Sequence, residues 1–207
     1  MRRKGFTLAE VLITLGIIGV VAAITIPSLV AKYHRKVAET KLKKFYSTMN
    51  QAIRLSIADQ GELPSIDTSE VKDHNNAELI ESYYKDNILK YMQGVNYEIT
   101  SGGGTYIKVS LNDGSGFSSY MPSGSTGEMW VMYCLNADEK HCKHERYDGI
   151  NQFLFIMDTN KGSMRTYDIE DKGKTSCLNS NPHDRHGCTQ WIKSNGWEIP
   201  KDYPWIK

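Results

Sequence analysis

Residues 1–31 read MRRKGFTLAEVLITLGIIGVVAAITIPSLVA, and they differ in character from the rest of the chain. Met1 is followed by the basic residues Arg2, Arg3 and Lys4, and from Phe6 to Ala31 the only ionisable side chain is Glu10. As a helix this run would be about 39 Å long, enough to cross a hydrocarbon core of about 30 Å. The basic head predicts that the N-terminus stays in the cytoplasm.

The whole chain has the composition of an ordinary globular protein. It has 207 residues, of which 40% are hydrophobic and 24% are charged, and these values exclude wholesale disorder. Lys plus Arg is 25 and Asp plus Glu is 24, for a net charge of +1. This balance gives no global electrostatic case for binding nucleic acid.

Two simple interpretations of the N-terminal segment compete with a third, and each leaves a feature of the sequence unexplained. A secretory signal peptide could be cleaved near Ala22 and Ala23, but the apolar run continues past them and then becomes a charged helix. A plain membrane anchor does not explain Glu10, because burying an unpaired carboxylate in a membrane costs several kcal/mol.

A third interpretation accounts for these features together. The stretch Lys4-Gly5-Phe6-Thr7-Leu8-Ala9-Glu10, followed by an apolar helix and Pro27, resembles the class III signal of type IV pilins and type II secretion pseudopilins. The resemblance covers roughly the first 60 residues, and its motif is specific. Ala9 departs mildly from the family, which usually has a larger apolar residue there. The resemblance implies cleavage after Gly5 and N-methylation of Phe6 by a membrane peptidase.

The resemblance also assigns Glu10 and Pro27 to filament assembly. Cleavage creates a cationic amine on Phe6, and opposite charges attract strongly in a low-dielectric helix bundle. In the family this Glu meets the amine of a neighbouring subunit and sets the axial stagger. Pro27 removes a backbone donor and clashes with the carbonyl of Ala23, so the helix should kink or loosen there. An ordinary kinked membrane helix is the alternative.

The next segment changes to an amphipathic helix that ends near Gln60, before Gly61 and Pro64. Its predicted apolar face, at spacings of three and four residues, consists of Ala38, Leu42, Phe45, Met49, Ala52 and Ile53, with Tyr46 and Ile57 beside them.

The expected fold is α+β and pilin-like: a long N-terminal helix with a membrane half and an amphipathic half, the latter packed on a small antiparallel sheet. The expected division is a leader (1–5), a transmembrane and polymerisation helix (6–31), an amphipathic helix (32–60) and a globular head with a cysteine-rich C-terminal region (61–207). In the head, alternation and turn residues predict a short helix at 78–92 and an antiparallel sheet of four to five strands. The candidate strands are 105–111, 117–121, 129–134, 152–157 and 164–169.

The amphipathic helix carries a basic cluster that has several interpretations. Binding to anionic lipid headgroups, to DNA or to acidic faces of adjacent subunits competes with an ordinary solvated helix face. In the expected topology the cluster lies outside the cytoplasm, against the positive-inside tendency. Its members are Lys32, Arg35, Lys36, Lys41, Lys43 and Lys44.

Four cysteines lie in the head: Cys134, Cys142, Cys177 and Cys188. In an exported domain they favour two disulfides, and the local pairs 134–142 and 177–188 are preferred among three connectivities. Zinc is the rival, because four histidines flank the cysteines, but no tight CxxC spacing supports it. These histidines are His141, His144, His183 and His186.

Other candidate sites in the head are weaker. Asp158 and Asn160 faintly resemble a calcium loop without EF-hand spacing, and a hairpin turn is favoured. The C-terminal aromatic residues Trp191, Trp197, Tyr203 and Trp205 are expected to pack in the core, with a ligand-stacking surface as the minority interpretation. No arrangement supports nucleophilic catalysis, so we expect no enzyme activity and no cofactor.

The resemblance implies a pilin-like structural subunit, either a type II secretion pseudopilin or a minor type IV pilin. It would span the inner membrane once, with the head periplasmic or extracellular. Its implied partners are other subunits, the prepilin peptidase/methyltransferase, an inner-membrane assembly platform and the bilayer. The alternative is a filament-borne binding module, such as an adhesin or a DNA-uptake pilin. Removal of the basic leader makes the remaining side-chain charge negative, which disfavours nucleic acid.

Overall fold

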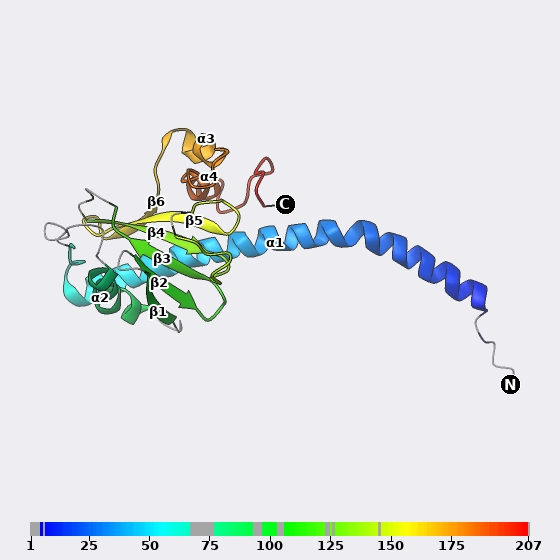
Figure 1. Ribbon diagram of the computed structural model, residues 1–207, viewed down its shortest axis with the longest axis horizontal. Helices are drawn as coiled ribbons and strands as arrows, with labels where there is room; N and C mark the ends of the chain where they lie inside the picture. The colour runs from blue at the N-terminus through cyan, green and yellow to red at the C-terminus, as the bar shows by residue number, and fades with distance from the viewer. Residues whose placement is uncertain are drawn as a thin grey trace.

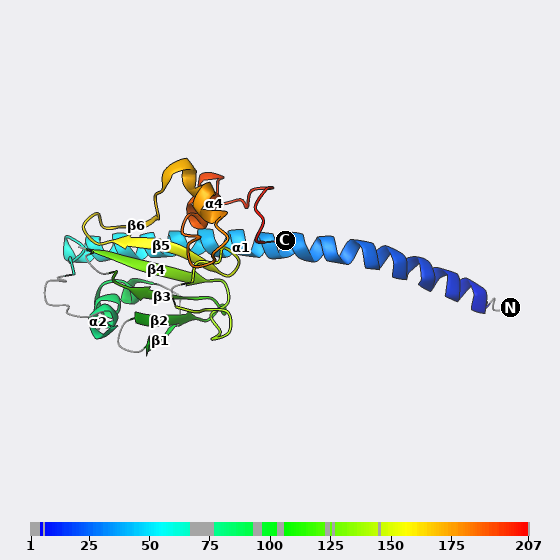
Figure 2. The ribbon, with the colours of Figure 1, turned by 45° about the horizontal axis from the view of Figure 1, so that its top comes forward.

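The computed structural model describes residue 5, residues 7–66, 77–92, 97–102, 106–122, residue 125, residues 127–144 and 146–206. A single long helix, α1 (Leu8–Gln60), projects from a head built on one sheet. Its N-terminal half extends away from the head, and its C-terminal half runs along the sheet (Figures 1 and 2). The fold is therefore α+β and pilin-like, as predicted.

The sheet is an antiparallel meander of six strands in chain order. The strands are β1 (Tyr97–Gly102), β2 (Tyr106–Leu111), β3 (Gly116–Tyr120), β4 (Glu128–Cys134), β5 (Gln152–Asp158) and β6 (Ser163–Thr166). The prediction of four to five strands was too small because it missed β1, and β6 ends before the predicted residue 169. The turn after β2 is a short hairpin in which Gly114 has a φ of +76°, whereas β4 and β5 are joined by the longer segment 135–151.

The remaining helices flank the sheet. α2 (Ala77–Asn87) and the 3-10 turn η1 (Leu89–Tyr91) occupy the predicted helical stretch, and α2 lies beside the β1–β3 end of the sheet (Figure 1). After β6 come η2 (Glu170–Gly173), α3 (Lys174–Cys177) and α4 (Cys188–Ser194), which the sequence analysis did not predict. Gly173 and Gly187 bring the two ends of this region together: a Cβ on Gly187 would lie 2.2 Å from the Gly173 carbonyl oxygen.

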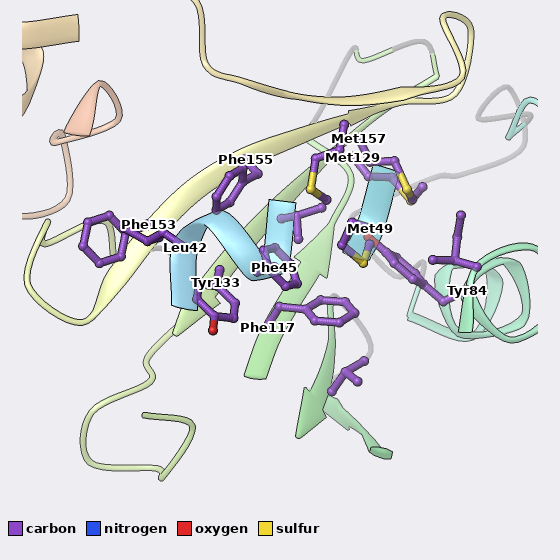
Figure 3. Packing of buried hydrophobic residues seen from close by; sticks show 14 of the residues in the cluster. Leu42, Phe45, Met49, Tyr84, Phe117, Met129, Tyr133, Phe153, Phe155 and Met157 are labelled. Atoms are coloured by element: carbon purple, nitrogen blue, oxygen red, sulfur yellow. The ribbon is translucent and has the colours of Figure 1, made fainter. Parts of the chain in front are cut away.

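The main core lies between α1 and one face of the sheet. All six predicted apolar-face positions of α1 are buried, which confirms its amphipathic pattern: Ala38, Leu42, Phe45, Met49, Ala52 and Ile53. Phe45 is at the centre, stacked on Tyr133 with ring centroids 4.2 Å apart and flanked by Phe117 and Phe155 (Figure 3). Burying a side chain of this size stabilises the fold by about 1.5–3 kcal/mol.

The other face of the sheet carries a second, smaller cluster formed by Met132, Tyr147, Leu154 and Ile156, with Trp130 and Tyr167 packed against it. Loops cover this face. His144 stacks on Tyr106 with centroids 3.8 Å apart, and His186 contacts the rings of Trp130 and Tyr147. The sheet is thus covered on both sides, by a helix on one and by loops on the other.

Candidate membrane and assembly site

The N-terminal half of α1 is an apolar helix that none of the described residues of the head cover. Its large apolar side chains between Leu8 and Val30 are 42–78% exposed. Length and composition make α1 a helix that could cross a membrane. The hydroxyl groups within this half bond to the helix itself, for example Thr25 Oγ1 to Val21 O at 2.9 Å and Ser28 Oγ to Thr25 O at 3.0 Å. The surface offered to lipid or to another helix is therefore almost wholly apolar.

Glu10 belongs to a capping box at the start of α1. The Thr7 backbone N–H and hydroxyl both donate to Glu10 Oε2 at 2.8 Å, and the Glu10 N–H donates to Thr7 Oγ1 at 3.3 Å. The sequence analysis missed Thr7 as a partner, although Thr-x-x-Glu before an apolar run is the signature of a capping box. Both bonds from Thr7 reach Oε2, which leaves Oε1 for another partner.

The predicted processing site lies just before this cap. Gly5 is exposed, and a Cβ placed on it would meet nothing within 4 Å. Phe6 and residues 1–4, which include the three basic residues, lie outside the described residues. Cleavage after Gly5 and methylation of Phe6 therefore stay predictions.

Pro27 lies inside α1 without ending it. The helix is continuous from Leu8 to Gln60 and curves smoothly through its N-terminal half (Figure 1). Because Pro27 has no N–H, the carbonyl four residues before it lacks its usual helical partner. The expected loosening of this stretch in an assembled filament stays a prediction.

The C-terminal segment of the head is fastened to α1 just beyond the apolar half. Arg35 Nη1 donates to Ile206 O at 2.9 Å, and Nη2 donates to Ile199 O at 2.9 Å and to Pro200 O at 2.8 Å. One turn further along α1, Glu39 Oε1 accepts from the Ile199 N–H at 2.9 Å. Arg35, one residue of the predicted basic cluster, therefore joins the head to α1, which forms the stalk of the molecule.

Two further members of the basic cluster also have structural partners. Lys41 Nζ donates to Leu135 O at 2.9 Å and to Asp113 O at 3.3 Å. Lys44 Nζ lies 3.5 Å from Asp113 Oδ2. Desolvation raises the pKa of Asp113, but hydrogen bonds from the Ser115 hydroxyl and N–H, followed by the charges of Lys41 and Lys44, hold this pKa below its usual range. The cluster is therefore not one uniform binding stripe.

All four described cysteines form disulfides, and they do so in the local pairs that the sequence favoured. Cys134 pairs with Cys142 with Cα atoms 5.7 Å apart, and Cys177 pairs with Cys188 at 4.5 Å. The first closes the loop after β4, and the second joins α3 to α4. Since each sulfur is bonded to another, no thiolate is left to bind zinc.

The four histidines considered for zinc are engaged in different places. His141 Nδ1 lies 2.7 Å from Asp138 Oδ1, and this contact lowers the pKa of Asp138. His144 and His186 pack against aromatic rings, and His183 is exposed on a loop. Within the described ranges, no group of three or more His, Cys, Asp or Glu is arranged to hold a metal ion.

The faint calcium loop is a hairpin turn between β5 and β6. Asp158 is buried, and its Oδ1 accepts from the Lys161 N–H at 3.0 Å. Its Oδ2 faces Lys161 Nζ at 3.4 Å and Arg165 Nε at 3.7 Å. Asn160 Oδ1 accepts from Ser65 at 3.3 Å. These oxygens serve the turn, as the hairpin interpretation predicts.

The C-terminal aromatic residues pack into the head. Tyr203 donates to Gly149 O at 2.6 Å, and burial raises the pKa of its phenol. Trp205 Nε1 donates to Cys177 O at 2.8 Å, and the Arg185 guanidinium lies 3.4 Å from the centroid of the Trp205 ring. The segment that Arg35 holds is thus also fixed to the second disulfide.

Comparison with known families agrees with this division between stalk and head. A model of the prokaryotic N-terminal methylation motif, the prepilin-type signal of type IV pilins and pseudopilins, matches residues 1–26. The signal, the exposed apolar helix and the head define a type IV pilin-like subunit, which is a structural class. The chain belongs to a family of unknown function (DUF6613), whose model matches residues 28–206. No curated protein and no solved structure matches it.

Proposed function

We propose that this chain is a structural subunit of a membrane-anchored filament, of the type II secretion pseudopilin or minor type IV pilin kind. In this proposal it is inserted in the inner membrane with its N-terminus in the cytoplasm. A prepilin peptidase cuts after Gly5 and methylates Phe6, and an assembly platform then moves the subunit into the filament. The two disulfides support a head outside the cytoplasm, since such bonds persist in oxidising compartments.

The observation that carries this proposal is an exposed apolar helix directly joined to a prepilin-type signal. This surface is stable in lipid, but it cannot remain bare when the subunit leaves the bilayer. Packing against the same helix of other copies would cover it. One surface therefore serves both as anchor and as polymerisation face.

Glu10 adds an electrostatic contact to this helix packing, because its carboxylate can pair with a cationic amine. Thr7 already occupies Oε2 of this carboxylate, and cleavage would place a cationic amine on the residue next to Thr7. Oε1 of Glu10 can then accept from an amine of the same subunit or of a neighbour. Inside a low-dielectric bundle, a carboxylate without such a cation would be costly.

The intact mass of the protein from its native membrane tests processing first. We expect a chain that begins at Phe6 and carries one added methyl group. A chain that begins at Met1 or near Ala23 would contradict the proposal.

Assembly is tested with Glu10→Gln, which keeps the size and hydrogen-bonding capacity of the side chain but removes its charge. We expect this variant to be inserted and processed normally and to be depleted from cross-linked filament fractions. Glu62→Gln, an exposed site in the head, is the matched control and should be incorporated normally. Equal incorporation of both variants would refute the role of Glu10.

A further inference from the structure

The part of the head closest to the apolar end of α1 is its C-terminal segment (Figures 1 and 2). The three hydrogen bonds from Arg35 hold residues 199–206 against the helix at this level. Arg35 follows Ala31 by four residues, or about 6 Å along the helix axis. The C-terminal segment therefore lies directly above the end of the apolar run.

This level falls in the headgroup layer of a bilayer when α1 tilts so that its apolar run, about 39 Å long, fits within the hydrocarbon core of about 30 Å and ends at the boundary of that core. The polar layer on each side of the hydrocarbon core is about 5–8 Å thick. Residues 32–36 extend about 2–8 Å beyond Ala31 along the axis, so they fall inside that layer when the apolar run fills the core. Tyr33 is 66% exposed here, and tyrosine is enriched at membrane interfaces.

The free charge at this level is positive. Lys32 and Lys201 are exposed, and in the described parts of the chain no carboxylate pairs with either. Lys36 pairs with Glu39 at 3.2 Å, but its own side chain stays 73% exposed while that of Glu39 is only 14% exposed. Asp202, next to Lys201, is paired with Lys174 at 2.6 Å. Glu39 is thus largely covered and Asp202 is paired, while Glu198 stays exposed, so the exposed lysines Lys32, Lys36 and Lys201 outnumber the carboxylate that faces solvent here.

We propose that Lys32, Tyr33, Lys36 and Lys201 form a membrane-proximal collar that binds anionic phospholipid headgroups in the leaflet from which α1 emerges. The inference rests on the proposed function, since it requires α1 to span the membrane. The lysine stems lie along the apolar boundary while their ammonium groups reach phosphates. Lys41 and Lys44, which stand higher on α1, bond within the head instead and do not belong to the collar.

The collar fixes the head relative to the bilayer. Arg35 makes the C-terminal segment one body with α1, so contacts from Lys32 and from Lys201 act together on the height and tilt of the head. Extraction of the subunit into a filament must then break these contacts. Anionic lipid would thus hold the unassembled subunit in the membrane more firmly than neutral lipid does.

The test measures lysine acylation rates in the full-length chain, reconstituted in lipid nanodiscs and resolved by peptide mass spectrometry. One set of discs contains phosphatidylcholine alone, and the other contains phosphatidylcholine with phosphatidylglycerol. We expect Lys32, Lys36 and Lys201 to react about fivefold more slowly in anionic discs, as about 1 kcal/mol per basic residue near an anionic surface implies. High salt should remove the difference, because it screens exposed charges.

Two lysines of the same chain serve as controls. Lys43 is exposed on α1 about 18 Å beyond Ala31, and Lys140 is exposed on a loop of the head. Both should react equally fast in the two kinds of disc. Lys201→Gln should leave insertion unchanged and weaken the protection of Lys32, whereas Lys43→Gln should not.

Three outcomes would overturn the collar. They are equal rates at all lysines in both discs, equal slowing at Lys43 and Lys140, and protection in neutral discs that appears only with added DNA or with a second subunit. Failure of the chain to enter the discs would instead refute the membrane anchor of the proposed function. The two proposals therefore fail in distinguishable ways.

Discussion

Arg35 and Ile206 are joined by a hydrogen bond of 2.9 Å across a sequence separation of 171 residues. The same guanidinium also donates to the carbonyls of Ile199 and Pro200. A single side chain of α1 is therefore hydrogen-bonded to both ends of the C-terminal segment. This contact lies where the stalk enters the head. The two parts of the molecule are therefore linked by polar contacts at the junction as well as by the core.

Replacing Arg35 should release the C-terminal segment. Arg35→Gln removes three charge-assisted hydrogen bonds, and bonds to charged groups contribute about 1.5–3 kcal/mol each. Because such losses are not additive, we expect unfolding in urea to become easier by about 2–3 kcal/mol in total. Amide exchange in residues 199–206 should accelerate. Lys43→Gln, at an exposed position further along α1, is the control, and a similar loss in that variant would show that the effect is one of net charge.

The core between stalk and head should depend most on Phe45. Phe45→Ala removes a ring that touches Phe117, Tyr133 and Phe155, and such deletions cost about 3–5 kcal/mol. Lys43→Ala, on the exposed face of the same turn, should change stability by less than about 0.5 kcal/mol. Denaturant midpoints measure both. A loss below about 1 kcal/mol for Phe45→Ala would contradict the central place of this ring.

The stalk was predictable because its signals are local. An apolar run with one carboxylate and a face of apolar residues at helical spacing need no distant partner to be recognised. Four strands were placed to within one residue at each end, since alternation and glycine turns mark them. The contact between Thr7 and Glu10 could also have been predicted, because Thr-x-x-Glu before an apolar run is a capping-box pattern; the sequence analysis used these residues only as part of the processing motif.

The parts that the sequence did not reveal depend on distant contacts. Among the strands that the structure describes, β1 pairs with β2 alone, and its stretch Tyr97–Gly102 lacks clear apolar alternation. α4 is a short helix stabilised by the close approach of Gly187 to Gly173 and by a disulfide. The role of Arg35 depends on carbonyls more than 160 residues away. In the sequence, Arg35 is one of six basic residues in the cluster, and nothing there distinguishes it from residues that could bind a ligand.

The Cys177–Cys188 disulfide should help to hold residues 199–206 in place against α1, and the Cys134–Cys142 disulfide should not. Removing Cys177–Cys188 with a double alanine variant should cost about 2.5–3 kcal/mol through lost loop-closure constraint. It should also speed amide exchange in residues 199–206, because Trp205 donates to the Cys177 carbonyl. Removing Cys134–Cys142 should cost a similar amount of stability without that change in exchange. Equal exchange in the two variants would contradict this link.

The loops that cover the sheet face opposite α1 should become less stable at mildly acidic pH, because His186 is protonated there. This imidazole packs between Tyr147, Tyr167 and Trp130, and burial lowers its pKa from the ordinary value of 6.5, against an opposing effect of Asp184. A lowered pKa means that the unfolded chain binds the proton more readily. The free energy of unfolding should therefore fall as pH drops from about 7.5 through about 6, and it should level off below the pKa of the folded state.

His186→Gln removes this titration, so the decrease in stability over this pH range should become smaller. His183→Gln, which changes an exposed histidine three residues away, should keep it. Urea unfolding between about pH 5.5 and 7.5 measures both, since carboxylates titrate mostly below that range. A pH slope that survives His186→Gln, or that disappears equally in His183→Gln, would assign the effect to other groups. The expected result would show that the packing of this imidazole, rather than the exposed histidines, makes the head sensitive to pH.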